Sequence, residues 1–383
     1  MPHFVYLDHN ATVPMKPAAR AAVEDALSLI GNPSSVHRYG RAARRLIEDS
    51  REKVAALVGV SPAAVVFTSG ATEANALAIG GLGRRRVLVA ATEHASVLAA
   101  APDAERIAVE RSGLVDLGDL ERRLAASPEP ALVSVMMANN ETGVIQPLAE
   151  VSRLARRFGA LVHTDAVQAA GRVPLQMEAL GVASLALSAH KLGGPAGVGA
   201  LVVDPALPLT ALLMGGGQER GRRAGTENLP GIAGFGAAAE AAHEALADQP
   251  RLGALRQRLE SNLRAAVPGV VVVGADAPRL ANTSCITMPA VAGETQVIAF
   301  DLAGVAVSAG AACSSGKVAA SRVLSAMGVG EEIARCAIRV SLGWTTTEAD
   351  IEAFIAAWLA IHGRAGRERQ RRAGADLLIG AGG

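Results

Sequence analysis

The sequence predicts an α/β protein with a mostly parallel central sheet, followed by a second, smaller α+β domain. Two observations lead to this prediction. From about residue 15 to residue 248, helical patterns alternate with short apolar runs, which is typical of parallel strands joined by helices. From about residue 249, the pattern changes to one long helical stretch, short strand-like runs and a final helix.

The expected domain boundaries follow from this change of pattern. Residues 15–248 would form the large domain, and residues 1–14 together with 249–363 would form the small one. The N-terminal segment has the pattern of a short strand. Residues 364–383 are rich in Arg, Gly and Ala, so we expect a flexible tail there.

In residues 15–248 we expect short strands that alternate with helices, and from residue 249 helices with short strands between them. Strands are expected at 64–68, 86–90, 131–136, 161–164, 185–188 and 200–203, with helices between them, such as 71–80 and 148–158. In the second section we expect a helix at 255–266, strands at 270–273 and 285–288, and a helix near 351–362.

Composition excludes several classes of protein. The net charge is +1, so there is no strong electrostatic attraction to nucleic acid or to a membrane surface. No apolar stretch reaches the roughly 20 residues of a membrane span, and the N-terminus lacks the pattern of a signal peptide. Cys285, Cys313 and Cys336 are too few and too scattered for a disulfide framework or a zinc site. We therefore expect a cytoplasmic protein without a structural metal.

Lys191 is the most informative residue of the chain. It follows the apolar run 182–187 and precedes a second apolar run at 199–203. Burial lowers the pKa of a lysine and leaves the free amine as a nucleophile. The obvious use is a Schiff base with the carbonyl of pyridoxal 5'-phosphate (PLP). A surface lysine in a glycine-rich turn is the alternative.

Two further segments fit a PLP site. Asp165 ends an apolar strand, where open α/β sheets place their ligands, and its carboxylate could pair with a pyridinium nitrogen. A helix N-cap is the alternative for Asp165. The segment 68–75 follows a strand and opens a helix, where free N–H groups and Thr72 favour a phosphate. An ordinary capping box with Ser69 or Thr72 as the cap is the alternative there.

Other polar residues also stand next to apolar runs. His94 could stack on a planar cofactor or act in acid–base chemistry, and Asn140 could donate to a carboxylate. Arg339 could clamp a carboxylate at two points. Their alternatives are a structural histidine, a polar turn and a solvated arginine. Cys313 lies among small residues and suits nucleophilic chemistry, whereas Cys285 and Cys336 fit a core.

Taken together and in order, these segments resemble the cysteine desulfurases, the NifS/IscS-like group of class V PLP-dependent enzymes. The likeness runs nearly end to end, over 6–12, 32–37, 68–75, 92–94, 139–143, 163–168, 188–194, 215–220, 225–228, Cys313 and 339–343. The resemblance implies a fold-type-I, aspartate-aminotransferase-like fold. It also implies conversion of L-cysteine to L-alanine, with the sulfur left as a persulfide.

The resemblance further implies roles for single residues. The cofactor-binding set would be Ala71, Thr72, His94, Asn140, Asp165, Gln168, Ser188, His190, Lys191 and, from the partner subunit of a homodimer, Thr226. Lys191 would hold PLP and move the Cα proton, and His94 would stack on the ring. Asn140 and Arg339 would bind the substrate carboxylate, and Cys313 would attack the substrate sulfur.

The resemblance also bears on partners and on alternatives. A sulfur-acceptor protein, such as an iron–sulfur scaffold, would take the sulfur from Cys313. Met214, the segment 317–321 and the tail beyond Gly363 depart from common family patterns, which leaves the acceptor open. A selenocysteine lyase, or another class V PLP-dependent lyase or aminotransferase, is the alternative activity. A catalytically idle binding partner is a third interpretation, which intact Lys191, Asp165 and Cys313 disfavour.

Overall fold

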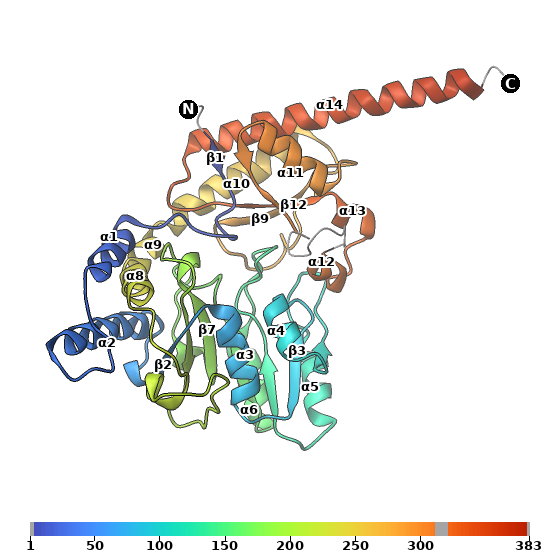
Figure 1. Cartoon of the computed structure of the whole chain (residues 1–383). Coiled ribbons are helices and arrows are strands. Elements are labelled where there is room, and N and C mark those ends of the chain that lie inside the picture. The colour runs from blue at the N-terminus through green and yellow to red at the C-terminus, as the bar shows by residue number, and fades with distance from the viewer. Residues whose placement is uncertain (1–3, 311–320, 381–383) are drawn as a thin grey trace.

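The computed structural model describes residues 4–310 and 321–380, with side chains up to 367. Its centre is a seven-stranded sheet in the order β2-β8-β7-β6-β5-β3-β4 (Figure 1). The strands are β2 (Val65–Thr68), β3 (Arg86–Ala90), β4 (Glu105–Ile107), β5 (Ala131–Ser134), β6 (Leu161–Asp165), β7 (Ser184–Ser188) and β8 (Gly199–Val203). All neighbours pair in parallel except that β8 runs antiparallel to both β2 and β7. The predicted mostly parallel sheet is therefore confirmed.

Side-chain alternation along the strands builds a core on each face of this sheet. In β2, Val65 and Phe67 pack into one core while Val66 packs into the other. Successive residues of a strand point to opposite faces, so an apolar run is expected where both faces are covered. One face carries α2 (Arg38–Val58), α5 (Leu117–Ala125), α6 (Leu148–Arg157) and α8 (Leu229–Glu240); the other carries α3 (Ala71–Gly81) and α4 (Ala95–Ala100).

A second, smaller unit stands above the sheet in Figure 1. Its strands β9 (Thr283–Thr287), β11 (Ser308–Ala309) and β12 (Ala337–Ser341) form an antiparallel sheet, and β1 (Val5–Tyr6) pairs with β10 (Val305–Ala306). Its helices are α10 (Gln249–Ala266), α11 (Gly293–Leu302), α12 (Arg322–Ala326), α13 (Glu331–Arg335) and α14 (Glu348–Gly380). Their core is separate from those of the large sheet and contains buried Phe300, Phe354 and Trp358. The separate cores support the proposed division into two domains.

The remaining helices connect these parts. They are α1 (Pro17–Leu27), α7 (Met177–Leu180) and α9 (Ala242–Ala247), with short 3-10 turns η1 (Pro62–Ala64), η2 (Ala189–Lys191) and η3 (Gln218–Gly221). No helix in the described part of the chain is both long enough and apolar enough to cross a membrane.

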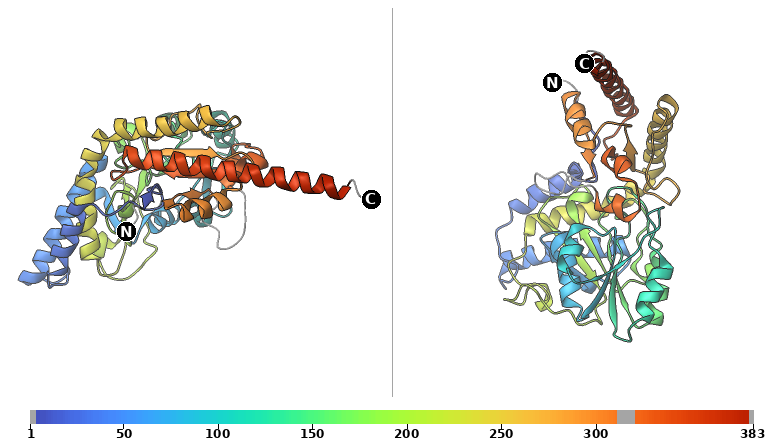
Figure 2. Two further views of the ribbon diagram at one scale, coloured as in Figure 1. Left: turned by 90° about the horizontal axis from the view of Figure 1, so that it is seen from above. Right: turned by 90° about the vertical axis from the view of Figure 1, so that its right-hand side faces the viewer.

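Two expectations about single elements were wrong. The segment 270–273 is not a strand: it forms one isolated bridge, between Val272 and Ile286. Gly269 and Gly274, with φ of 85° and 76°, turn the chain on either side of it. The last helix does not end near 362 but continues as α14 to Gly380, projecting beyond the rest of the molecule (Figures 1 and 2). Alanine, arginine and glutamate favour helix, and no proline interrupts them. The mobility of residues 364–383 stays a prediction.

Candidate active site

A cavity of about 540 Å³ lies at the carboxyl ends of β2, β6 and β7 and is closed by residues of the smaller unit. It brings together the residues that the sequence predicts for the cofactor and the substrate. Its lining includes Ala71, Thr72, His94, Asn140, Asp165, Gln168, Ser188, His190, Lys191 and Arg339. These residues come from segments as far apart as the strand ends of the large sheet and β12.

Lys191 lies in the 3-10 turn that directly follows β7. Its ammonium donates to the backbone oxygens of Asn10, at 2.6 Å, and Ala11, at 2.7 Å. Burial, with the positive charges of Arg339 and Arg172, lowers the pKa of Lys191 to about 8. The alternative of an ordinary surface lysine is therefore excluded, and a neutral amine is accessible near neutral pH.

Asp165 ends β6 and is only 5% exposed. Its Oδ2 accepts a hydrogen bond from Asn75 Nδ2 at 2.8 Å, and its Oδ1 accepts one from the N–H of Val167 at 3.0 Å. No helix follows directly, so Asp165 is not a helix N-cap. The carboxylate is instead held in a fixed orientation at the cavity wall.

A chain of hydrogen bonds connects Asp165 with His94 through Asn75 and Ser96, whose hydroxyl lies 2.8 Å from Nδ1 of His94. Asn75 Nδ2 donates both to Asp165 and, at 2.9 Å, to the hydroxyl of Ser96. Asn75 Oδ1 must then accept from Nε2 of His163, at 3.0 Å, and burial keeps His163 neutral by lowering its pKa to about 4. The ring proton of His163 therefore lies on Nε2.

His94 is the N-cap of α4, and its Nδ1 accepts the backbone N–H of Ser96 at 3.2 Å. Because a backbone N–H can only donate, the ring proton of neutral His94 lies on Nε2. Sequence reasoning assigned no role to Asn75, Ser96 or His163. Asn75 and His163 lie in 68–75 and 163–168, two segments that carried the family resemblance, and this resemblance was the only signal that could have indicated them.

The start of α3 provides an anion site. The helix begins after Gly70 and has no side-chain cap, so its first N–H groups open toward the cavity. The expected alternative, a capping box with Ser69 or Thr72 as the cap, is not found. Glu73 accepts the N–H of Ser69 at 2.7 Å and pairs with Arg223 at 2.8 Å, which leaves the helix terminus free.

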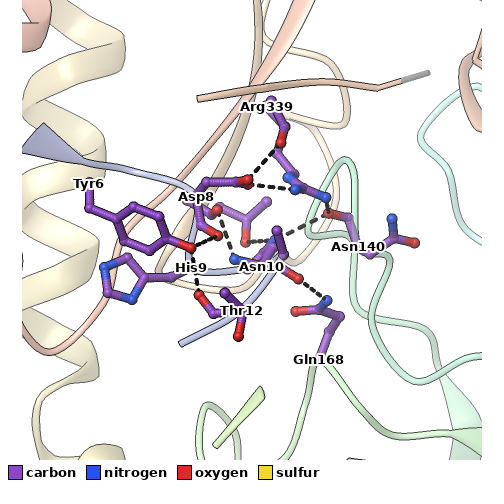
Figure 3. Close-up of polar contacts among 12 residues, drawn as sticks. Tyr6, Asp8, His9, Asn10, Thr12, Asn140, Gln168 and Arg339 are labelled. Carbon is purple, nitrogen blue, oxygen red and sulfur yellow. Dashed lines mark hydrogen bonds and ion pairs between the residues drawn. The ribbon is translucent and has the colours of Figure 1, made fainter. Parts of the chain in front are cut away.

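The N-terminal segment reaches across the opposite wall of the cavity (Figure 3). Asp8 forms an ion pair with Arg339 at 2.6 Å and accepts a hydrogen bond from Ser308 at 2.7 Å. Asn10 donates to the backbone oxygen of Asn140 at 3.1 Å, and its own backbone oxygen accepts from Gln168 at 3.0 Å. Sequence reasoning assigned no role to Asp8 or Asn10, although both lie in the segment 6–12 that carried the resemblance. Nothing in the local pattern predicts a contact with residues more than a hundred positions away.

Two predicted residues are not among the described residues that line this cavity, for different reasons. Thr226 is exposed and lies in the loop after η3. Cys313 lies outside the described residues, so its role stays a prediction. Cys285 and Cys336 are both buried, as expected, and burial raises the pKa of the Cys285 thiol to about 12. Neither of these two suits nucleophilic chemistry.

The donor set of the cavity fits PLP. A lysine amine with a lowered pKa can bind an aldehyde, and an uncapped helix N-terminus beside Ser188 and His190 can bind a phosphate. The buried carboxylate of Asp165 can face a pyridinium nitrogen. Fold and site together define a fold-type-I PLP enzyme.

Comparisons with known proteins agree. The sequence model of the aminotransferase class-V family matches residues 5–354. The chain is 44% identical over 366 residues to a cysteine desulfurase of Cereibacter sphaeroides, covering 92% of this chain and 94% of that one. It is 39% identical over 394 residues to an IscS-like cysteine desulfurase of Mycobacterium tuberculosis, covering 97% and 99%. The X-ray structure of a NifS-like protein from Rickettsia africae ESF-5 has a TM-score of 0.86 and 38% identity, covering 94% and 100%. The chain therefore belongs to the class-V aminotransferases, in the group of the cysteine desulfurases.

Proposed function

We propose that this protein is a PLP-dependent cysteine desulfurase that converts L-cysteine to L-alanine and transfers the sulfur to Cys313. The observation that carries the proposal is one cavity that unites the amine of Lys191, the buried carboxylate of Asp165 and the guanidinium of Arg339. When bound, PLP supplies an electron sink for the carbon next to the substrate amine.

The residues of the chain divide the remaining work. Lys191 binds the cofactor and, as a base with a pKa near 8, moves the proton at the substrate Cα. Asp165 keeps a proton on the ring nitrogen, because its orientation is fixed by Asn75 and Val167. Gln168 Nε2, which also donates to the backbone oxygen of Asn10, donates to the ring oxygen, and the uncapped start of α3, with Thr72, holds the phosphate.

Arg339 binds the substrate carboxylate together with Asn140. The Nε of Arg339 is buried and has no hydrogen-bond partner among the described residues, while its other nitrogens are held by Asp8 and by the Asn140 backbone. A buried donor without a partner is costly, and a carboxylate would satisfy it. The amino acid is thereby fixed by its carboxylate.

Sulfur transfer completes the reaction. The Cys313 thiolate attacks the sulfur of the substrate, an S–S bond forms, and the carbon–sulfur bond breaks. The electron pair left on the carbon takes up a proton, and alanine results. Selenocysteine would fit the same site, but the relatives reported above are named cysteine desulfurases.

Oligomerisation and sulfur delivery complete the proposed function. Thr226 of one subunit reaches the phosphate site of the other in a homodimer. Three exposed apolar side chains lie shortly before η3, which Thr226 follows: Leu212, Leu213 and Met214, at 47%, 48% and 89% exposed. Such exposed apolar side chains suit burial against a second copy of the chain. A cytoplasmic acceptor protein, such as an iron–sulfur scaffold, would then take the sulfur from Cys313.

The test follows the sulfur. Wild-type protein treated with cysteine and then alkylated should carry one extra sulfur on the peptide spanning 305–322, as mass spectrometry would show. Cys313→Ser should bind PLP and cysteine but release almost no sulfide or alanine, whereas the matched control Cys336→Ser should keep its turnover. Wild-type turnover in Cys313→Ser would contradict the proposal.

A further inference from the structure

Arg172 is a buried arginine that the proposed reaction does not use. It is 8% exposed, and no Asp or Glu among the described side chains, at 4–310 and 321–367, pairs with its guanidinium. Burying a charge without an acidic partner is expensive unless its hydrogen bonds are satisfied. Within the same ranges, the guanidinium donates to uncharged oxygen atoms of His9, Asn10 and Gln168.

The contact with Gln168 fixes the orientation of an amide. Arg172 Nη1 donates to Gln168 Oε1 and, at 3.3 Å, to the Gln168 backbone oxygen. A guanidinium can only donate, so Oε1 of Gln168 must face Arg172. Nε2 of Gln168 then faces the other way, where it donates to the backbone oxygen of Asn10 at 3.0 Å. The amide therefore places its NH2 group at the cavity wall, and one of the two N–H bonds of this group is not used by Asn10.

The contact with Asn10 reaches Lys191. Arg172 Nη1 donates to Asn10 Oδ1 at 2.8 Å. The backbone oxygen of the same Asn10 accepts the Lys191 ammonium at 2.6 Å. Arg172 thus fixes the side chain of the residue whose backbone oxygen accepts the Lys191 ammonium.

The charge of Arg172 also acts on Lys191. The charged groups that face Lys191 are Arg339, Arg172, Asp165 and Asp8, with the neutral ring of His190 beside them. The two arginines favour the neutral amine, and the two carboxylates favour the ammonium. Removal of Arg172 shifts this balance toward the ammonium.

We propose that Arg172 is a positioning residue of the active site, which orients the Gln168 amide and Asn10 and favours the neutral form of the Lys191 amine. Its effect on Lys191 is independent of the reaction that the enzyme catalyses. Its effect on turnover through Gln168 rests on the proposed function.

The first measurement is made on the full chain after removal of PLP. Lys191 would be acetylated at a series of pH values and quantified by mass spectrometry, relative to Lys53 on the surface. In wild type, the labelling midpoint should lie near the lowered pKa of about 8. In Arg172→Met the midpoint should move to higher pH, and each tenfold rise in the proton affinity of the amine should lower labelling at neutral pH about tenfold. Arg172→Lys, which keeps the charge, should retain the wild-type midpoint.

The matched control is Arg86→Met. The Arg86 side chain is also only 9% exposed and donates to backbone oxygens, at Ser127 and Arg123, although it is paired with Glu105 at 2.7 Å. It begins β3 at the other end of the sheet. This control should lose stability without moving the midpoint of Lys191. An unchanged midpoint in Arg172→Met, or the same change in Arg86→Met, would overturn the proposed effect on Lys191.

The second measurement separates orientation from charge in the PLP-loaded enzyme. Nη1 of Arg172 makes the contacts with both Gln168 and Asn10, and the nitrogen of a lysine at 172 would lie one bond nearer the main chain. A lysine there keeps the charge but cannot reach both residues as the arginine does. Arg172→Lys should therefore lower kcat with little change of KM and alter the visible absorbance of bound PLP. In a Gln168→Leu background, the same substitution should lower kcat by a smaller factor, because only the contact with Asn10 remains to be lost. Wild-type kcat and absorbance in Arg172→Lys would refute the orienting role even if Arg172→Met does not fold.

Discussion

Replacement of Asp165 by asparagine exchanges one carboxylate oxygen for an NH2 group and should affect both stability and catalysis. The carboxylate accepts from Asn75 Nδ2 at 2.8 Å and from the Val167 N–H at 3.0 Å. An amide has only one oxygen, so one of these two donors would face an NH2 group. Asn75 cannot turn its own amide to compensate, because its oxygen is held by His163. Leaving a buried donor unpaired costs ~1–3 kcal/mol.

The catalytic loss should be larger and separate from the loss of stability. Without the carboxylate, the proton on the ring nitrogen is no longer stabilised. Removal of one preorganised electrostatic group typically costs ~3 kcal/mol in the transition state, about a hundredfold in rate. Asp165→Asn should therefore still bind PLP through Lys191 but form alanine about a hundredfold more slowly, at saturating PLP and cysteine.

The matched control is Asp119→Asn, at a carboxylate that is 9% exposed and also accepts a backbone N–H, that of Ala108. Thermal unfolding should show both variants to be destabilised. Steady-state alanine formation should be reduced only in Asp165→Asn. If the two variants turned over equally fast, Asp165 would have no electrostatic role in the reaction.

Three further predictions concern other buried or exposed groups. Lys191→Ala should abolish the visible absorbance of a PLP–lysine adduct and the borohydride fixation of the cofactor. In the cofactor-free wild type, PLP uptake should accelerate with rising pH up to about 8, since burial lowers the Lys191 pKa to that value. Burial, with the nearby Asp165 charge, raises the pKa of Glu93 to about 8. The folded state therefore holds a proton that the unfolded state releases, and the free energy of unfolding of the wild type should fall between about pH 4.5 and 8. Glu93→Gln should remove that fall in thermal scans, and an unchanged pH profile would disprove the assignment. Thr226→Ala should weaken PLP retention, and mixed dimers with Lys191→Ala subunits should regain one complete site; a fully active monomer would contradict this.

The part of the site that lies on the large sheet was predictable from sequence. Parallel strands end at one edge, so polar residues that follow apolar runs, such as Asp165 and Lys191, are expected to converge there. Strand β4 was missed because Glu105 and Arg106 interrupt its apolar pattern. Asp8 and Asn10 were missed for another reason. Their contacts with Arg339 and Gln168 depend on how the two units dock, which no local pattern encodes.

The charges around the cavity show why this docking matters for function. Arg339 is neutralised in part by Asp8 at 2.6 Å, and Glu73, in the first turn of α3, is paired with Arg223 at 2.8 Å. Asp165 thus remains as the negative group set against the amine of Lys191 and the positive end of a helix. Such a cavity attracts the phosphate of a cofactor and the carboxylate of an amino acid at separate walls. The sheet alone provides the first wall, and the second exists only because the N-terminal segment and β12 pack against it.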